Sequence, residues 1–428
     1  MSFFQLATLF MCLVAVGGWV NLRTLKLPHG VAMMLAGAVG ALVLGALHRL
    51  SPDLSGANTV IDAVEHIDFP QTVLGYLLGF LLFAGAMQVN VGDLRRRSLS
   101  VWTLATVGVA VSTVIVGAGV WLAADWLGVP LPLPWALVFG ALISPTDPVA
   151  VLATLRGGEL SRGLKVVLQG EALFNDGVGI VVFTALLAFA AGEAPSAGVT
   201  LLKVALQAGG GFAVGAGGGW IAIRAMRLVD DYVVEVSLSL ALAMGVYAVS
   251  QALDLSGPIA AVGAGLVVGA NRSAPTMSET TRAHLTTFWS LVDEILNAVL
   301  FFLLGLLLLV VAPLELRTAS LAAAAIVLVL VARLAVVLPW GAYFHIRYAE
   351  AGASRILVWG GLHGALSVAL ALSLPTAPAR PVILAVTYVV CAFSVAVQGI
   401  TFAPLAARLS PSPAADRSDG AQSMPGTG

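Results

Sequence analysis

Two carboxylates and a carboxamide interrupt the apolar segment GEALFNDGVGIVVF, residues 170–183. Glu171 and Asn175 are four residues apart and share one face of a helix, and Asp176 is the next residue round. Their oxygens bind hard cations, and a carboxylate also takes a proton. Charged groups inside a membrane helix are costly and face a bundle interior or a wet cavity, so the cluster predicts an ion or proton site. A polar cluster that only joins helices is the alternative.

A further acid, Asp147, stands between two prolines in LISPTDPVAV, residues 142–151. Pro145 and Pro148 each lack a backbone N–H, so they break a helix and free carbonyl oxygens. A helix broken at membrane depth is tolerated only where protein or a wet cavity covers it. We therefore predict a cation site made of freed carbonyls and the Asp147 carboxylate; a simple proline kink is the alternative.

A third irregular segment, WGGLHGALSVALALSLP, covers residues 359–375. Glycines and polar residues weaken a helix that is otherwise apolar, which predicts a second interruption. The residues concerned are Gly360, Gly361, His363, Gly364 and Ser367.

The amino-acid composition indicates which kind of protein holds these residues in place. The chain is 59% hydrophobic and 10% charged, with a mean hydropathy of +0.98, whereas a soluble domain is about a quarter charged. This predicts a polytopic membrane protein in contact with lipid, and no basic stripe indicates nucleic-acid binding. Cys12 and Cys391 lie in apolar runs and suit small core positions better than a disulfide or metal site. The run from Phe3 has no basic segment before it, so we expect a first span and not a signal peptide.

Thirteen apolar runs are long enough to cross about 30 Å of hydrocarbon, the shortest being 256–270. We therefore predict an all-α protein with thirteen transmembrane helices. The runs are 3–21, 29–47, 70–88, 100–124, 134–154, 166–191, 198–223, 232–252, 256–270, 286–312, 319–344, 356–375 and 382–406.

The basic residues give an independent orientation, because cytoplasmic loops collect Lys and Arg. With the N-terminus outside, 16 of the 21 basic residues lie on the inner side, four lie outside, and Arg333 falls within the eleventh run. We expect the cell inner (plasma) membrane, with the C-terminus cytoplasmic. Residues 409–428 are rich in Ser, Pro, Gly and Ala and predict a disordered cytoplasmic tail.

The two interrupted runs are the fifth and the twelfth. If runs one to six repeat as eight to thirteen, these positions are equivalent, and the odd offset of seven makes the two six-helix repeats inverted. Interrupted helices at corresponding positions of inverted repeats indicate a transport site where they cross.

Five motifs now carry a family resemblance: SPTDPVAV, GEALFNDGVG, VARLAVVLP around Arg333, FWSLVDEILNAVLFFLLG and WGGLHGALSVALALSLP. Together they resemble the NhaP-type sodium/proton antiporters, relatives of the eukaryotic sodium/hydrogen exchangers. The resemblance implies a homodimer, with a fixed dimerisation part and a moving core. The antiporter domain then covers 1–408, and its core bundle includes the spans near 100–191 and 319–406.

The resemblance also implies roles for single residues. Asp176 takes the ion and the proton alternately, while Asp147 and the backbone of Thr146 are further Na⁺ ligands. The supporting residues are Ser144, Glu171, Asn175, Arg333 and His363. Among these, Glu171 and Arg333 match a buried ion pair, and Asn175 packs against the crossing.

Two positions depart from the family pattern. Ala172 replaces a serine whose hydroxyl serves as a ligand, so we expect a water molecule to stand in for it. His363 replaces an arginine, which removes a fixed charge. A neutral, hydrogen-bonded His363 and a pH-sensing His363 are the two alternatives.

These features predict a secondary transporter that exchanges Na⁺, or Li⁺, for H⁺ by alternating access. A buried carboxylic acid holds its proton more tightly than one in water, so protons and Na⁺ compete for Asp176. Asn175 cannot titrate and Glu171 is held by Arg333, which favours electroneutral exchange of one cation for one proton. No cofactor is expected, and the protein is not expected to be an enzyme.

Three other functions remain open on the sequence. A K⁺/H⁺ antiporter would use the same oxygens, and so would a cation channel, which is separated from a carrier by its conductance. An intramembrane aspartyl protease would need two buried aspartates, but Asp176 lies in FNDGVG and not in the G-x-G-D pattern of such enzymes.

Overall fold

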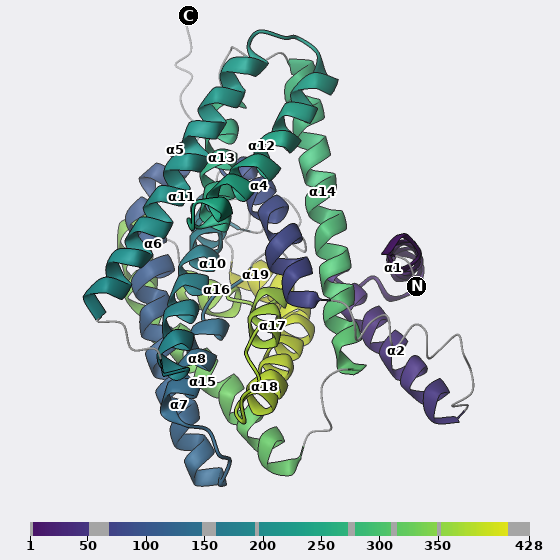
Figure 1. The fold of residues 1–428 in the computed structure, drawn as a ribbon, viewed down its shortest axis with the longest axis vertical. Coiled ribbons are helices and arrows are strands. Elements are labelled where there is room, and N and C mark those ends of the chain that lie inside the picture. Colours follow the sequence, from purple (N-terminus) through teal and green to yellow (C-terminus); the bar gives the residue numbers. More distant parts are fainter. Residues whose placement is uncertain are drawn as a thin grey trace, which may run out of the picture.

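The computed structural model describes residues 3–50, 68–147, 160–192, 197–272, 279–309, 315–348 and 352–409, and every regular element in these ranges is a helix (Figure 1). The helices are α1 (Phe3–Val20), α2 (His29–Leu50), α4 (Leu78–Gln88), α5 (Val91–Arg96), α6 (Ser98–Thr103), α7 (Val109–Leu127), α8 (Leu133–Ile143), α10 (Arg162–Ala190), α11 (Ala197–Met226), α12 (Tyr232–Ala252), α13 (Gly257–Arg272), α14 (Glu279–Leu306), α15 (Leu316–Tyr348), α16 (Ala353–Trp359), α17 (Ala365–Leu372), α18 (Arg380–Phe393) and α19 (Gly399–Leu409). Short irregular helical turns lie at Asn21–Leu25, Gln71–Leu77, Leu104–Gly108, Leu307–Leu309 and Ser394–Gln398.

Within the described ranges, nine helical stretches are long and apolar enough to cross a membrane. Three shorter apolar helices accompany them: Leu78–Gln88, Leu133–Ile143 and Gly257–Asn271. The prediction of an all-α membrane protein is confirmed. Each of the thirteen predicted runs overlaps a helix or an interrupted helix, but the number that cross the membrane stays a prediction.

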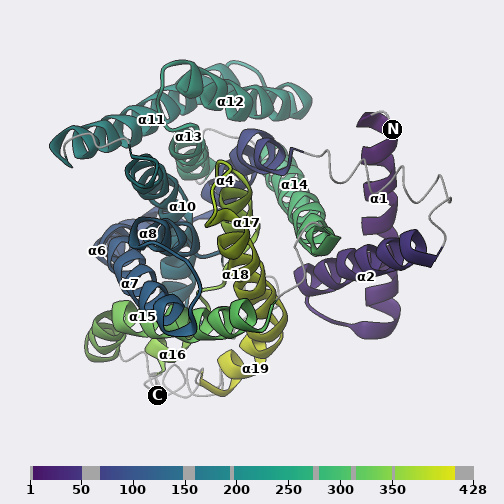
Figure 2. The same cartoon turned by 60° about the horizontal axis from the view of Figure 1, so that its bottom comes forward.

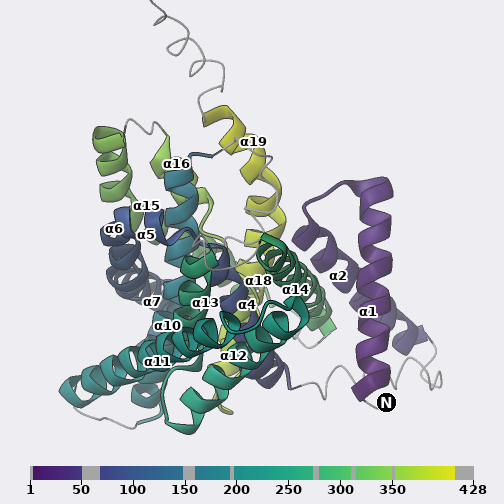
Figure 3. The same ribbon diagram turned by 90° about the horizontal axis from the view of Figure 1, so that it is seen from above.

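The helices pack in two groups. In the first, α2 lies against α14, and α13 lies against α4, α11 and α12; in the second, α7 packs on α8 and α15, α10 on α8, and α18 on α15 and α17. Fewer contacts join the groups, chiefly those of α10 with α4 and α13 and of α14 with α17. Figure 2 shows α1, α2 and α14 on one side and α6, α7 and α15 on the other, and Figure 3 shows the same separation.

Glycine allows α2 and α14 to approach each other closely. A Cβ atom on Gly37 would lie 2.1 Å from the carbonyl oxygen of Phe302, and one on Gly305 would lie 2.1 Å from that of Met34. Helices in a membrane gain packing energy from such small residues, because their backbones come into contact. This contact fixes α14 to α2 in the first group.

A helix ends at each of the two predicted interruptions. Helix α8 ends at Ile143, before Pro145, and residues 360–364 separate α16 from α17. Pro148 lies outside the described residues. One boundary needs correction: the predicted tail began at Leu409, but α19 continues through this residue, which packs against the core. The rest of the predicted tail is outside the described residues.

Candidate functional site

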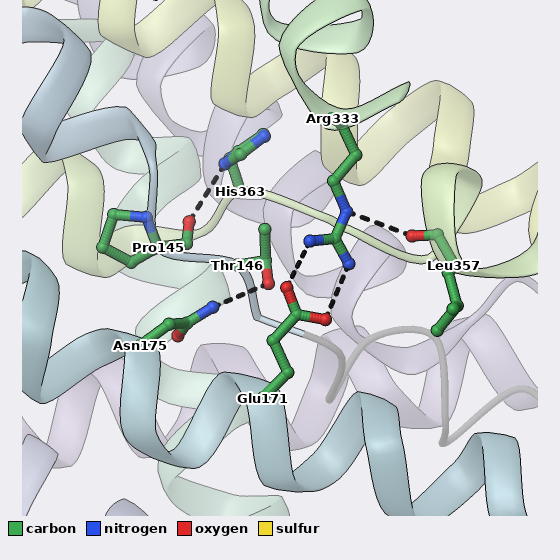
Figure 4. A network of polar contacts seen from close by, with 7 residues as sticks. All are labelled: Pro145, Thr146, Glu171, Asn175, Arg333, Leu357 and His363. Carbon is green, nitrogen blue, oxygen red and sulfur yellow. Dashed lines mark hydrogen bonds and ion pairs between the residues drawn. The ribbon is translucent and has the colours of Figure 1, made fainter. Parts of the chain in front are cut away.

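The two interrupted helices meet through their freed backbone groups. The Asp147 N–H donates to the carbonyl oxygen of Leu362 at 2.7 Å, and Nδ1 of His363 lies 3.0 Å from the carbonyl oxygen of Pro145 (Figure 4). The backbone N–H of His363 donates to Ser394 Oγ at 2.9 Å. The Asp147–Leu362 and His363–Pro145 contacts therefore join the two broken helices, and the His363 N–H is paired with the segment that follows α18.

A cavity of about 440 Å³ lies beside this crossing. Thr146, Asp147 and Asp176 line it, so the structure brings together the three predicted ion-binding residues. Both aspartates are half-buried. The lining comes from both helix groups, since α4 and α14 contribute to it as well as α10 and α17.

One face of α10 lines the cavity along much of the length of the helix. Helix α10 begins after Ser161, whose Oγ caps it by accepting a hydrogen bond from the Leu164 N–H at 3.1 Å. Lys165, Gln169 and Asp176 follow at helical spacing on the lining face. Lys165 is exposed and Asp176, eleven residues further on, lies about 16 Å deeper. The exposed residues of the lining are His29, Lys165 and Glu294.

The charge arrangement suits one small hard cation or a proton. Among the described residues, no three His, Cys, Asp or Glu side chains gather closely enough to hold a metal ion between them. Asp147 and Asp176 supply carboxylate oxygens, and the end of α8 supplies carbonyl oxygens that no helix turn occupies. Oxygen ligands of this kind suit alkali cations better than transition metals. Ala172 also lines the cavity and has no oxygen to add.

A second, much smaller cavity of about 10 Å³ lies on the other side of the crossing. Ser144, Glu171, Asn175, Arg333 and His363 line it, and Thr146 is the predicted site residue that lines both cavities. The volume is that of about one water molecule. The five supporting residues are therefore gathered behind the ion site, separated from the larger cavity.

Asn175 links the small cavity to the ion site. It is almost fully buried, and its Nδ2 donates to Thr146 Oγ1 at 2.9 Å. Its Oδ1 accepts no hydrogen bond from any other described side chain or backbone group. Asn175 thus positions Thr146, and its free oxygen can accept a hydrogen bond from a water molecule in the small cavity.

Glu171 and Arg333 form a buried ion pair between α10 and α15. Arg333 Nη2 donates to Glu171 Oε2 at 2.9 Å, and Nη1 donates to Oε1 (Figure 4). The Arg333 Nε donates to the carbonyl oxygen of Leu357 at 3.1 Å. A Cβ atom on Gly361 would lie 2.5 Å from this Nε, so the glycine makes room for the guanidinium. The two residues are in contact, as the family resemblance implied.

The other two predicted supporting residues, His363 and Ser144, contact α8 or the residues that follow it. His363 is buried and its ring contacts the freed Pro145 carbonyl, so it supports the end of the broken α8. Ser144 Oγ donates to the Gly140 carbonyl oxygen at 2.6 Å and lies 3.2 Å from Thr113 Oγ1. Ser144 does not line the larger cavity, which places it away from Asp176.

Sequence reasoning missed the acidic lining contributed by α14. Asp293 and Glu294 line the larger cavity together with Asn297. Asn297 Nδ2 donates to Asp293 Oδ1 at 3.0 Å. The signal was present, because Asp293 is an acid well inside a predicted span, as Asp147 is. Nothing in the sequence shows that α14 faces the crossing.

Residues 10–408 match the family model of the transmembrane sodium/hydrogen exchangers. The chain is 39% identical to the Na(+)/H(+) antiporter NhaP of Pseudomonas aeruginosa, over 97% of this chain and 99% of that protein. It is 34% identical to the Na(+)/H(+) antiporter NhaH of Halobacillus aidingensis, over 90% and 93%. Its fold matches the sodium proton antiporter MjNhaP1 of Methanocaldococcus jannaschii with a TM-score of 0.71 at 20% identity, over 96% and 98% of the chains. The chain therefore belongs to the sodium/hydrogen exchanger family, whose members are membrane transporters and not enzymes.

Proposed function

We propose that this protein exchanges Na⁺ for H⁺ across the membrane. The observation that carries the proposal is that Asp147 and Asp176 line one cavity beside the crossing of two interrupted helices. Relatives that match nearly the whole chain are named as Na⁺/H⁺ antiporters. Membership of a transporter family argues against the aspartyl protease alternative.

Asp176 carries Na⁺ and the proton alternately in this mechanism. Asp147, the backbone of Thr146 and freed carbonyls of the broken helix complete the Na⁺ site, with a water molecule in place of the hydroxyl that Ala172 lacks. No cofactor takes part. An empty, deprotonated site would leave uncompensated negative charge in the membrane, so the carrier crosses only when loaded. Because Asn175 does not titrate and Glu171 is paired with Arg333, one proton moves for each Na⁺.

Alternating access requires one part of the protein to move past another. We assign the moving core to the spans near 100–191 and 319–406, within the antiporter domain 1–408, because these helices pack mainly on each other. The remaining helices are the fixed part and provide the homodimer interface. Thirteen spans in two inverted six-helix repeats, with crossed helices in spans five and twelve, account for this arrangement.

The proposed orientation puts the N-terminus outside and the C-terminus in the cytoplasm of a cell with this protein in its plasma membrane. Lys165 and His29 then lie at the cytoplasmic surface, and both are exposed residues of the cavity lining. We infer that the cavity opens to the cytoplasm at these residues, so that this conformation is inward-facing.

The direct test of function is the purified protein in proteoliposomes that contain a pH-sensitive dye. Na⁺, Li⁺ and K⁺ are added in turn under an imposed proton gradient. We expect Na⁺ to move protons, with Li⁺ as a second substrate. Proton movement with K⁺ alone would make the protein a K⁺/H⁺ antiporter, and a large single-channel conductance would make it a channel.

Gly364→Ala should weaken the Na⁺ site without removing a ligand. A Cβ atom on Gly364 would lie 2.9 Å from Asp147 Oδ2, so the carboxylate must move. We expect the Na⁺ concentration for half-maximal exchange to rise about fivefold or more, equivalent to about 1 kcal/mol of binding energy. Gly217→Ala is the matched control, because its Cβ atom would meet nothing within 4 Å. Equal behaviour of the two variants would show that Asp147 is not a Na⁺ ligand.

A further inference from the structure

Two carboxylates of the larger cavity, Asp293 and the more exposed Glu294, belong to the opposite helix group from Asp147 and Asp176. Asp293 lies on α14, is half-buried and lines the same cavity. Its side chain accepts a hydrogen bond from Asn297 Nδ2 at 3.0 Å. Asn297 also lies on α14, so this hydrogen bond is made within the first helix group.

Asp293 shares the cavity with the ion site, since Asp293, Asp147 and Asp176 all line it. No three acidic, His or Cys side chains of the described residues gather closely enough to bind one metal ion. A negative charge near a site with low-dielectric walls raises the local concentration of cations and their affinity for the site.

The contacts of α14 make this influence depend on conformation. The close approach at Gly37 and Gly305 fixes α14 to α2, whereas Asp147 and Asp176 belong to the second group. Movement of the core past α14 therefore changes the distance from Asp293 to the ion site.

We propose that Asp293 is a side-specific determinant of Na⁺ affinity. It strengthens Na⁺ binding when the site faces the cytoplasmic cavity, and its contribution falls when the core moves to the outward-facing conformation. The inference rests on the proposed Na⁺/H⁺ exchange and on the orientation given above. Its consequence is tighter loading of Na⁺ from the cytoplasm than from outside, which suits a protein that exports Na⁺.

The test is Asp293→Asn, with Na⁺-dependent proton flux measured in everted and in right-side-out vesicles. We expect the half-saturating Na⁺ concentration to rise on the order of fivefold on the cytoplasmic side, as for one charge that acts across a hydrated cavity. On the outer side we expect a change below about twofold. Asp230→Asn, which removes an exposed carboxylate outside the cavity, is the control for net charge.

Asn297→Ala provides a second variant that keeps the Asp293 charge and loses only its hydrogen bond. Asn297→Ala should raise the half-saturating Na⁺ concentration on the cytoplasmic side by about twofold. If Asp293→Asn does not fold, this variant tests the role of Asp293 in its place. Equal shifts on the two sides, no cytoplasmic shift, or loss of exchange from both sides in folded protein would overturn the inference. Absence of exchange in the unsubstituted protein would instead overturn the proposed function.

Discussion

Replacing Asp176 with Asn is expected to abolish Na⁺-driven proton movement. The amide has nearly the same shape as the carboxylate but cannot take up a proton at neutral pH, and it offers Na⁺ no charge. Asp176 lines the cavity on a helix that is capped and packed independently of it. The variant should therefore insert and dimerise as the unsubstituted protein does, with exchange reduced to the level of empty liposomes.

Asp125→Asn is the appropriate control, because Asp125 is an exposed residue near the end of α7. Both variants are checked by gel filtration in detergent before reconstitution. Exchange by Asp176→Asn above the background of empty liposomes would exclude Asp176 as the proton carrier. The carrier would then have to be another carboxylate of the cavity: Asp147, Asp293 or Glu294.

Breaking the buried ion pair should produce the largest loss of stability. Arg333→Ala leaves the Glu171 carboxylate buried with no guanidinium beside it, and losing one partner of such a pair commonly costs about 3–5 kcal/mol. Arg333 also bonds the Leu357 carbonyl, so the end of α16 loses a contact as well. We expect a clearly lower midpoint of thermal unfolding in detergent, together with weaker transport.

A double variant tests whether Glu171 and Arg333 stabilise the protein as a pair or independently of each other. Glu171→Gln combined with Arg333→Gln removes both charges and should recover part of the stability that Arg333→Ala loses. Arg355→Ala, at an exposed site, should change the midpoint little and serves as the control. If the double variant loses as much as the two single changes together, Glu171 and Arg333 do not stabilise each other.

The sequence predicts those parts of the site that depend only on neighbouring residues in the chain. Pro145 ends a helix wherever it stands in one, so the break before Asp147 follows from the sequence alone. The glycines of the second interruption act in the same local way. The pairing of Glu171 with Arg333 is different: 162 residues separate them, and only the family resemblance indicated it.

Long-range neighbours account for what the sequence left out. Asp293 stands in a quoted motif, yet its place opposite Asp147 depends on α14 packing beside α17 and α4. The contact of His363 with the Pro145 carbonyl likewise joins residues 218 positions apart. Apolar periodicity shows that a helix has a buried face but does not identify the helix that covers it.

The most direct test of the central mechanism, one proton exchanged for one Na⁺ at a single carboxylate, is the null point of transport. Proteoliposomes are clamped with valinomycin at several K⁺ potentials, and the Na⁺ gradient that just stops proton flux is measured at each. Electroneutral exchange predicts that flux stops when the Na⁺ and H⁺ concentration ratios are equal, at every potential. A null point that shifts with membrane potential would contradict the mechanism and require a second proton carrier.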